Sequence, residues 1–180
     1  MWIRSIAALC VVLAVAVAGS AGAGEPKFVM QPLLDGKVMI AVPRDFELMS
    51  DDMARLKYPS ERRPPIVFTD SEGTVNITVK PTAQRVTEAD IDIARIFLTE
   101  NFRRLYPSGN VGSTLFDLGD RTAFFISMTT PAIDTEIRSL ITGAAVDGRL
   151  VLFGFNVTRE LESTWIDKGA IILMTVLIFD

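Results

Sequence analysis

The sequence contains no histidine, and its single cysteine, Cys10, lies inside an apolar run near the N-terminus. Histidine is the commonest general base and metal ligand, and zinc sites are built mainly from Cys and His. Their absence after residue 23 excludes Ser-His-Asp and Cys-His catalysis and ordinary zinc sites. The sequence also has no glycine-rich phosphate loop and no D-x-D-x-D-G calcium loop. We therefore expect no enzyme, no metal and no cofactor.

Positive charge is scarce as well. The chain has 18 Lys and Arg against 22 Asp and Glu, which gives a formal net charge of −4. A mildly acidic protein is a poor candidate for binding nucleic acid or anionic lipid, because both carry negative charge. We expect the partner to be another protein.

The first 23 residues have the composition of a secretory signal peptide. Arg4 supplies a positive charge, 6–18 is uncharged and apolar, and 21–23 fits the A-x-A cleavage pattern. A transmembrane anchor is the alternative, but the apolar run is shorter than the ~20 residues that a span needs. We expect cleavage after Ala23, no stable membrane span thereafter, and a single domain at 24–180. A secreted chain without cysteine suits a bacterial periplasm.

The rest of the chain alternates pairs of strands with helices. Asp35-Gly36 and Asp147-Gly148 are hairpin turn signals, and the flanking residues alternate between apolar and polar. The strands arrive as hairpins and not as βαβ units, which predicts an α+β protein. We expect an antiparallel sheet of about six or more strands with helices packed on both faces, an α/β/α sandwich. Strands are expected at 28–34, 37–42, 66–68, 74–80, 114–118, 121–129, 136–146 and 149–158, and helices at about 50–58, 87–106 and 161–175.

The two longer helices are expected to face the sheet with apolar stripes. In the first, which begins at Thr87 and ends before Pro107, the stripe has helical spacing and is flanked by Ile93 and Phe97. In the second, Trp165 is expected to face inward. The apolar run 170–179 is too short to cross a bilayer and predicts a buried helix end with a short terminal segment. The expected stripe of the first of these helices consists of Ile91, Ala94, Leu98, Phe102 and Leu105.

The segment from Arg55 to Pro65 is basic and proline-rich in an otherwise acidic chain. Tyrosine and arginine are enriched at the energetic centres of protein interfaces, so the segment is a candidate partner contact. Alternatively, Tyr58 packs under the loop and the arginines are solvated or paired with Asp51 or Asp52. The candidate binding residues are Lys57, Tyr58, Arg62 and Arg63.

A family resemblance centres on the same segment. A strand ends at the proline of Val42-Pro43-Arg44-Asp45-Phe46. The motifs that follow are Lys57-Tyr58-Pro59, Arg63-Pro64, Ile66-Val67-Phe68 and the run 73–77. This arrangement resembles the PsbP-like superfamily, which includes the periplasmic DcrB-like proteins. The resemblance implies an antiparallel sheet between helices and non-enzymatic work as an assembly factor, accessory subunit or small chaperone. The lipoprotein cysteine of many DcrB-like proteins is missing here.

Two functions and one remote alternative follow. The first is a non-enzymatic periplasmic or secreted accessory module that binds an unidentified protein. The second is a periplasmic immunity protein that neutralises a secreted toxin. An enzyme that uses carboxylates alone is the third, although helix starts explain the acid pairs Asp51-Asp52 and Glu160 with Glu162.

Overall fold

The computed structural model describes residues 26–59, 63–132 and 134–179. The expected signal peptide lies outside these residues. The described elements are β1 (Phe28–Leu33), β2 (Val38–Pro43), β3 (Glu47–Leu48), α1 (Asp51–Lys57), β4 (Ile66–Thr69), β5 (Val75–Arg85), α2 (Ile91–Leu105), β6 (Gly112–Leu118), β7 (Arg121–Pro131), β8 (Glu136–Val146), β9 (Arg149–Thr158), α3 (Glu162–Met174) and β10 (Leu177–Ile178), with short 3-10 turns before α2 and α3.

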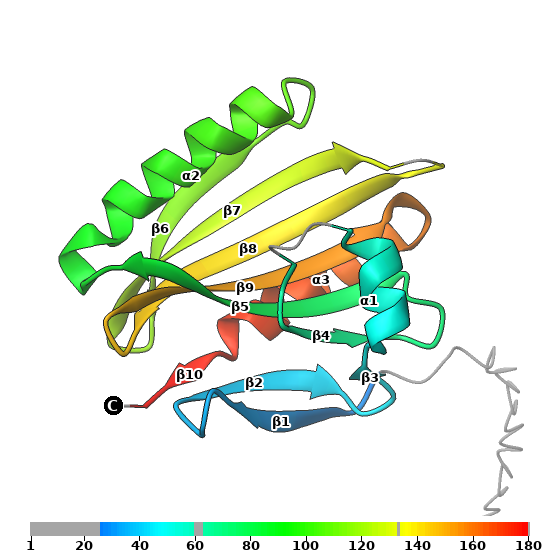
Figure 1. The fold of residues 1–180 in the computed structure, drawn as a ribbon, viewed down its shortest axis with the longest axis horizontal. Coiled ribbons are helices and arrows are strands. Elements are labelled where there is room, and N and C mark those ends of the chain that lie inside the picture. Colours follow the sequence, from blue (N-terminus) through cyan, green and yellow to red (C-terminus); the bar gives the residue numbers. More distant parts are fainter. Residues whose placement is uncertain (1–25, 60–62, 133, 180) are drawn as a thin grey trace, which may run out of the picture.

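The strands form two sheets, and all of their pairings are antiparallel. The large sheet has seven strands in the order β3-β4-β5-β9-β8-β7-β6. The small sheet has the order β1-β2-β10, so the expected first hairpin is separate from the main sheet (Figure 1). The predicted α+β class and the antiparallel sheet of at least six strands are confirmed.

The β8–β9 hairpin turns at Asp147-Gly148, as the sequence predicts. Both residues have positive φ, 53° and 70°, which is the conformation that a two-residue hairpin turn requires. The strands then stay in register from Val146 opposite Arg149 to Ile137 opposite Thr158. This turn fixes which β9 side chains face each layer of the protein.

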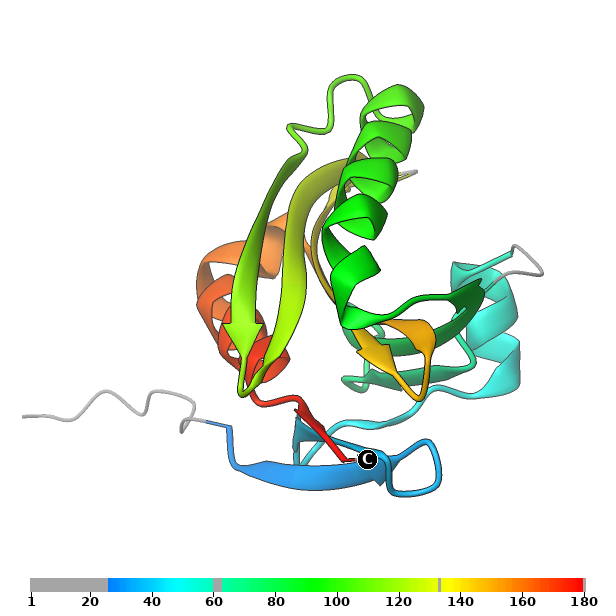
Figure 2. The same cartoon turned by 90° about the vertical axis from the view of Figure 1, so that its left-hand side faces the viewer.

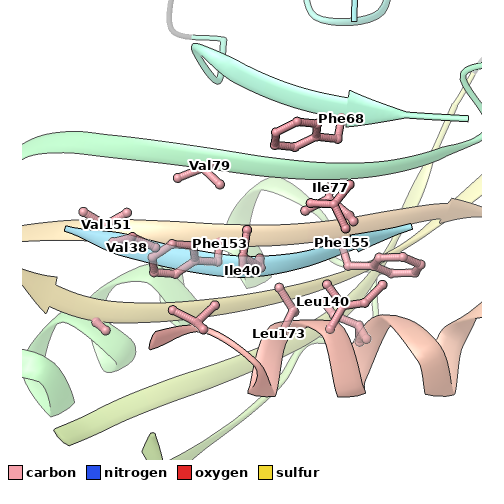
Figure 3. Packing of buried hydrophobic residues seen from close by; sticks show 14 of the residues in the cluster. Val38, Ile40, Phe68, Ile77, Val79, Leu140, Val151, Phe153, Phe155 and Leu173 are labelled. Carbon is pink, nitrogen blue, oxygen red and sulfur yellow. The ribbon is translucent and has the colours of Figure 1, made fainter. Parts of the chain in front are cut away.

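Helices cover both faces of the large sheet. The views in Figures 1 and 2 place α2 on one face and α3 on the other. Alternate residues of β9 enter the α3 side, where Phe153 and Phe155 are fully buried (Figure 3). Strand β2 adds Val38 and Ile40 to that core, and Trp165 packs 5.4 Å from Phe46 between ring centres. The expected inward position of Trp165 is confirmed.

Helix α2 covers only part of its face. Its core cluster includes Ile91 and Ala94 and reaches Phe102, but it does not include Leu105 at the end of the helix. Leu105 is therefore 68% exposed, and its expected core position is wrong. Phe97 on the outer flank is 57% exposed. The sequence pattern reveals an apolar stripe, but it cannot show where the underlying sheet ends.

The C-terminal helix end is buried only in part. Ile172 and Leu173 are buried, whereas Ile171 and Met174 on the same helix end are exposed. The short terminal segment that the sequence predicts pairs with β2 as β10, opposite Met39 and Val38. No helix of the described residues is long and apolar enough to cross a membrane.

Candidate binding surface on helix α1

Helix α1 begins and ends where the sequence predicts. Ser50 is the N-cap, and its hydroxyl accepts a hydrogen bond from the Met53 N–H at 3.3 Å. Tyr58 caps the other end, because the residue before a proline disfavours the α region. No residue of α1 is buried, so the helix lies on the surface of the domain.

Leu56 is the most exposed large apolar side chain among the described residues, at 81%. Its helix contacts the domain through another face, where Met53 and Lys57 both approach Gly73 in the β4–β5 turn. These two residues are four apart and therefore share one side of the helix. Leu56 is left in solvent between the basic residues Arg55 and Lys57.

Lys57 anchors the end of α1. Its ammonium group donates a hydrogen bond to the Gly73 carbonyl at 2.6 Å. Gly73 has a φ of +70°, and a Cβ there would lie 2.6 Å from the Lys57 Cε. A glycine is needed both for the turn and for the close approach of the lysine. Lys57 is therefore at least partly a structural residue.

Tyr58 turns toward the large sheet and hydrogen-bonds Asn156 on β9. The Asn156 Oδ1 also accepts a hydrogen bond from the Ser139 hydroxyl at 2.8 Å. Burial raises the pKa of Tyr58 to about 12, and the hydrogen bond with Asn156 opposes this only in part. The tyrosine remains neutral, and it joins α1 to the centre of the sheet.

The structure gives the three described members of the predicted binding set different surroundings. Lys57 and Tyr58 hold α1 in place, whereas Arg63 lines a different hollow of about 260 Å³ beside Asp51 and Arg55. Arg62 lies outside the described residues. Asp52 was one of the two acids considered as partners for the loop arginines. It pairs instead with Arg55 of its own helix, at 2.6 Å.

The tyrosine contact predicts a pH effect on stability. The unfolded chain loses the Tyr58 proton near pH 10, but the folded chain keeps it to about pH 12. The stabilisation from neutral Tyr58 should be intact below pH 10 and should be lost between pH 10 and 12. Absorbance titration at alkaline pH should show a late phenolate step that Tyr58→Phe removes. A titration unchanged by that variant would contradict the assignment.

Asp70, an acidic residue near α1, has structural partners. A hollow of about 320 Å³ includes Asp45, Glu47 and Asp70. The Asp70 carboxylate accepts hydrogen bonds from the N–H groups of Thr74 and Val75 and from the Thr74 hydroxyl, so it stabilises the β4–β5 turn. Among the described residues, no group of three His, Cys, Asp or Glu side chains is placed to hold a metal ion.

Among the residues that the structure describes, three carboxyl groups have shifted pKa values, and all three shifts are downward. Hydrogen bonds from the Thr87 backbone and side chain lower the pKa of Asp90, and Lys37 lowers that of Asp147. Hydrogen bonds from its own N–H, Thr135 and Thr158 lower the pKa of Glu160. A general acid at neutral pH needs a raised pKa, so these three carboxyl groups suit turns and caps, not acid catalysis.

No protein-family model and no curated protein sequence matches this chain. Several solved structures match most of it, among them the following three. Cyanobacterial PsbP from Synechocystis has a TM-score of 0.61 at 11% identity, covering 91% of this chain and 99% of its own. The Ran-binding protein Mog1p from Saccharomyces cerevisiae has a TM-score of 0.55 at 13% identity, covering 86% and 97%. LpqN from Mycobacterium tuberculosis, described as involved in cell envelope biogenesis, has a TM-score of 0.52 at 14% identity, covering 87% and 92%.

These similarities establish a fold. At 11–14% identity, the function of each of those proteins is not transferred to this chain. The chain has the PsbP-like fold, and the resemblance inferred from its sequence is confirmed at that level.

Proposed function

We propose that this PsbP-like domain acts outside the cytoplasm as a non-catalytic accessory module that binds another protein through α1. The N-terminal composition supports export, with cleavage after Ala23 and a mature domain of residues 24–180. Among proteins of the same fold, Mog1p is described as Ran-binding and LpqN as involved in cell envelope biogenesis. The lowered carboxyl pKa values and the structural partners of Asp70 also favour binding over catalysis.

The observation that carries the proposal is the 81% exposure of Leu56 on a helix with no buried residue. Single exposed apolar side chains are common on protein surfaces, so the site is proposed on Leu56 together with the neighbouring arginines, a residue type enriched at interface hot spots. Arg55 and Lys57 flank Leu56, and Arg63 follows the helix. We therefore propose a partner with an apolar pocket rimmed by carboxylates.

The ion pair between Arg55 and Asp52 does not prevent this contact. Both side chains are mostly exposed, at 58% and 93%, and such pairs are worth about 0–1 kcal/mol in water. Giving up the pair with Asp52 therefore costs Arg55 little when it turns to a partner carboxylate. Arg63, which lines the neighbouring hollow, can pair with a second acid.

A photo-cross-linking side chain at position 56 tests the proposal in the intact host. Leu105 is the matched control, since it is also a leucine near the end of a helix and is 68% exposed. We expect one discrete heavier adduct from position 56 and none from position 105. Arg63→Glu should weaken that adduct because it reverses the charge next to the contact.

Affinity for the cross-linked protein should fall more than tenfold in Leu56→Asp and remain unchanged in Leu105→Asp. Truncation or reversal of a central interface residue commonly has an effect of this size. Equal cross-linking from positions 56 and 105, or none from 56, would refute α1 as the contact surface.

A further inference from the structure

The large sheet has one long edge without a neighbouring strand, at β6. The opposite edge, β3, has two residues, whereas β6 has seven and pairs only with β7 in the part of the chain that the structure describes. Edge strands are usually protected by proline, lysine or a β-bulge, because their free backbone groups can pair with another chain. Strand β6 contains neither proline nor lysine, and its register with β7 shows no shift between Gly112 and Leu118. This edge is therefore available to a further strand.

The turn that joins β6 to β7 determines which backbone groups are free. Gly119-Asp120 is a two-residue turn in which Gly119 has a φ of +67°, as in a type II′ hairpin. Its flanking residues, Leu118 and Arg121, lie opposite each other. In such a hairpin this pair exchanges both backbone hydrogen bonds, and pairs of this kind then alternate along the ladder. The residues whose N–H and C=O groups point away from β7 are Ser113, Leu115 and Asp117.

These outward backbone groups have almost no partners. Among the described residues, no backbone hydrogen bond outside the β6–β7 ladder involves any of them. The Leu115 carbonyl accepts only the hydroxyl of the adjacent Thr114, at 3.1 Å in an exposed position. A hydroxyl rotates freely and can turn to water instead, so an incoming N–H can replace it.

The side chains of the three outward residues lie on the α2 side of the sheet. The Ser113 hydroxyl accepts a hydrogen bond from Arg95 of α2 at 2.9 Å, and side chains two apart on a strand share a face. Leu115 is 41% exposed on this face. Arg95 also pairs with Asp92 at 2.6 Å, but a guanidinium has enough N–H groups to bind a further acceptor.

Asp117 is the only charged residue of β6. It is exposed and has no hydrogen bond or ion pair with any described residue. The edge therefore has the Arg95 guanidinium beside Ser113 at one end and an unpaired carboxylate at the other.

A second copy of the chain matches this edge if two β6 strands pair antiparallel about a two-fold axis at Leu115. Leu115 then lies opposite its counterpart, and each Ser113 lies opposite Asp117 of the other copy. All of the outward residues form hydrogen-bonded pairs in this register, and no other symmetric register pairs all of them. Each Asp117 carboxylate also comes next to Arg95 of the other copy, and complementary charges of this kind fix the register of an interface.

We propose that the protein forms a two-fold symmetric dimer in which β6 pairs with β6 and the two large sheets become one continuous sheet. Two-fold dimers are the commonest oligomers, and their interfaces must be self-complementary, as this edge is. Figure 1 shows α1 beside β3 and β4, at the opposite margin of the sheet from β6. The dimer leaves α1 uncovered in both copies, so this proposal does not depend on the α1 contact.

Cysteine substitutions along β6 test the register, because Cys10 is the only cysteine and lies in the expected signal peptide. The two Cα atoms at position 115 would be about 5.5 Å apart, within the range of roughly 4.4–6.8 Å that a disulfide spans. Under mild oxidation, Leu115→Cys should give a disulfide-linked dimer on a non-reducing gel. Asp117→Cys is the matched control on the same edge, since its two copies would be about 13 Å apart and should not cross-link. The wild-type chain reports any contribution of Cys10.

Sedimentation velocity over a series of concentrations measures the dimer without a cross-link. Leu115→Pro should raise the dimer Kd roughly tenfold or more, because it removes an outward N–H from both strands and no bond to β7. Leu115→Thr keeps that N–H and should remain a dimer. Asp117→Arg should weaken the dimer, because it places two positive charges side by side. The wild-type and Leu115→Cys results test the proposal even if the proline variant fails to fold.

A wild-type protein that stays monomeric at every concentration would overturn the proposal. So would equal cross-linking from positions 115 and 117, or a dimer that Leu115→Pro leaves unchanged. If Leu115→Cys cross-links in the intact host only to a different protein, the proposal is overturned in favour of a strand supplied by that protein.

Discussion

Phe155→Ala should lower the free energy of unfolding by about 4 kcal/mol, the size typical of a phenylalanine removed from a core. Phe155 is fully buried on β9, between its cross-strand neighbours Ile77 and Leu140. Its ring also lies against the backbone of α3, where a Cβ on Gly169 would be 2.2 Å from the Phe155 Cδ1. The truncation would leave a cavity where the sheet and α3 meet.

Urea unfolding followed by circular dichroism measures this effect. Phe179→Ala is the matched control, because Phe179 is 46% exposed and only its backbone N–H pairs with Lys37. The control should lose less than about 1 kcal/mol, as exposed substitutions usually do. Similar losses for the two variants would show that α3 does not depend on Phe155.

The second large effect is expected from one added methyl group. In Gly143→Ala, the new Cβ would lie 2.1 Å from the tip of the Phe124 ring. Phe124 is fully buried, and Ile91 and Ala94 of α2 belong to the same cluster, so the ring cannot move without displacing the helix. Overpacking of a core costs about 1–3 kcal/mol, and we expect the upper part of that range.

A double-mutant cycle identifies the cause. Phe124→Leu shortens the obstructing ring, so it should destabilise the protein less when residue 143 is alanine than when it is glycine. We expect an interaction energy of at least about 1 kcal/mol between the two changes, as for other residues in contact. Strictly additive losses would place the strain elsewhere, for example in the β8 backbone.

Local sequence signals predicted the elements well because their causes are local. The positive-φ turn at Asp147-Gly148, the Ser50 cap and the proline after Tyr58 act within a few residues. Alternation along 149–158 likewise places Phe153 and Phe155 on one face, and both are buried in the structure. None of these predictions needs information about a distant segment.

The candidate site could be predicted only in part. The segment 55–65 was identified as notable, but the sequence offered no sign that Tyr58 would meet Asn156, which lies 98 positions further along the chain. The alternating polar residues of β8 and β9 were the one available signal, since they mark Ser139 and Asn156 as facing away from the α3 core. Which residue would cover them was not encoded locally.

By itself, the sequence determined the α+β class, the antiparallel hairpins and the absence of histidine chemistry. Only the tertiary structure decided that the first hairpin joins β10 in a separate sheet and that the cover of α2 stops before Leu105. It also decided that Tyr58 and Tyr106, 48 positions apart, line one groove. The physical reason is the range of the interactions: turns, caps and periodicity act between near neighbours, whereas sheet order and the placement of helices depend on contacts between distant segments.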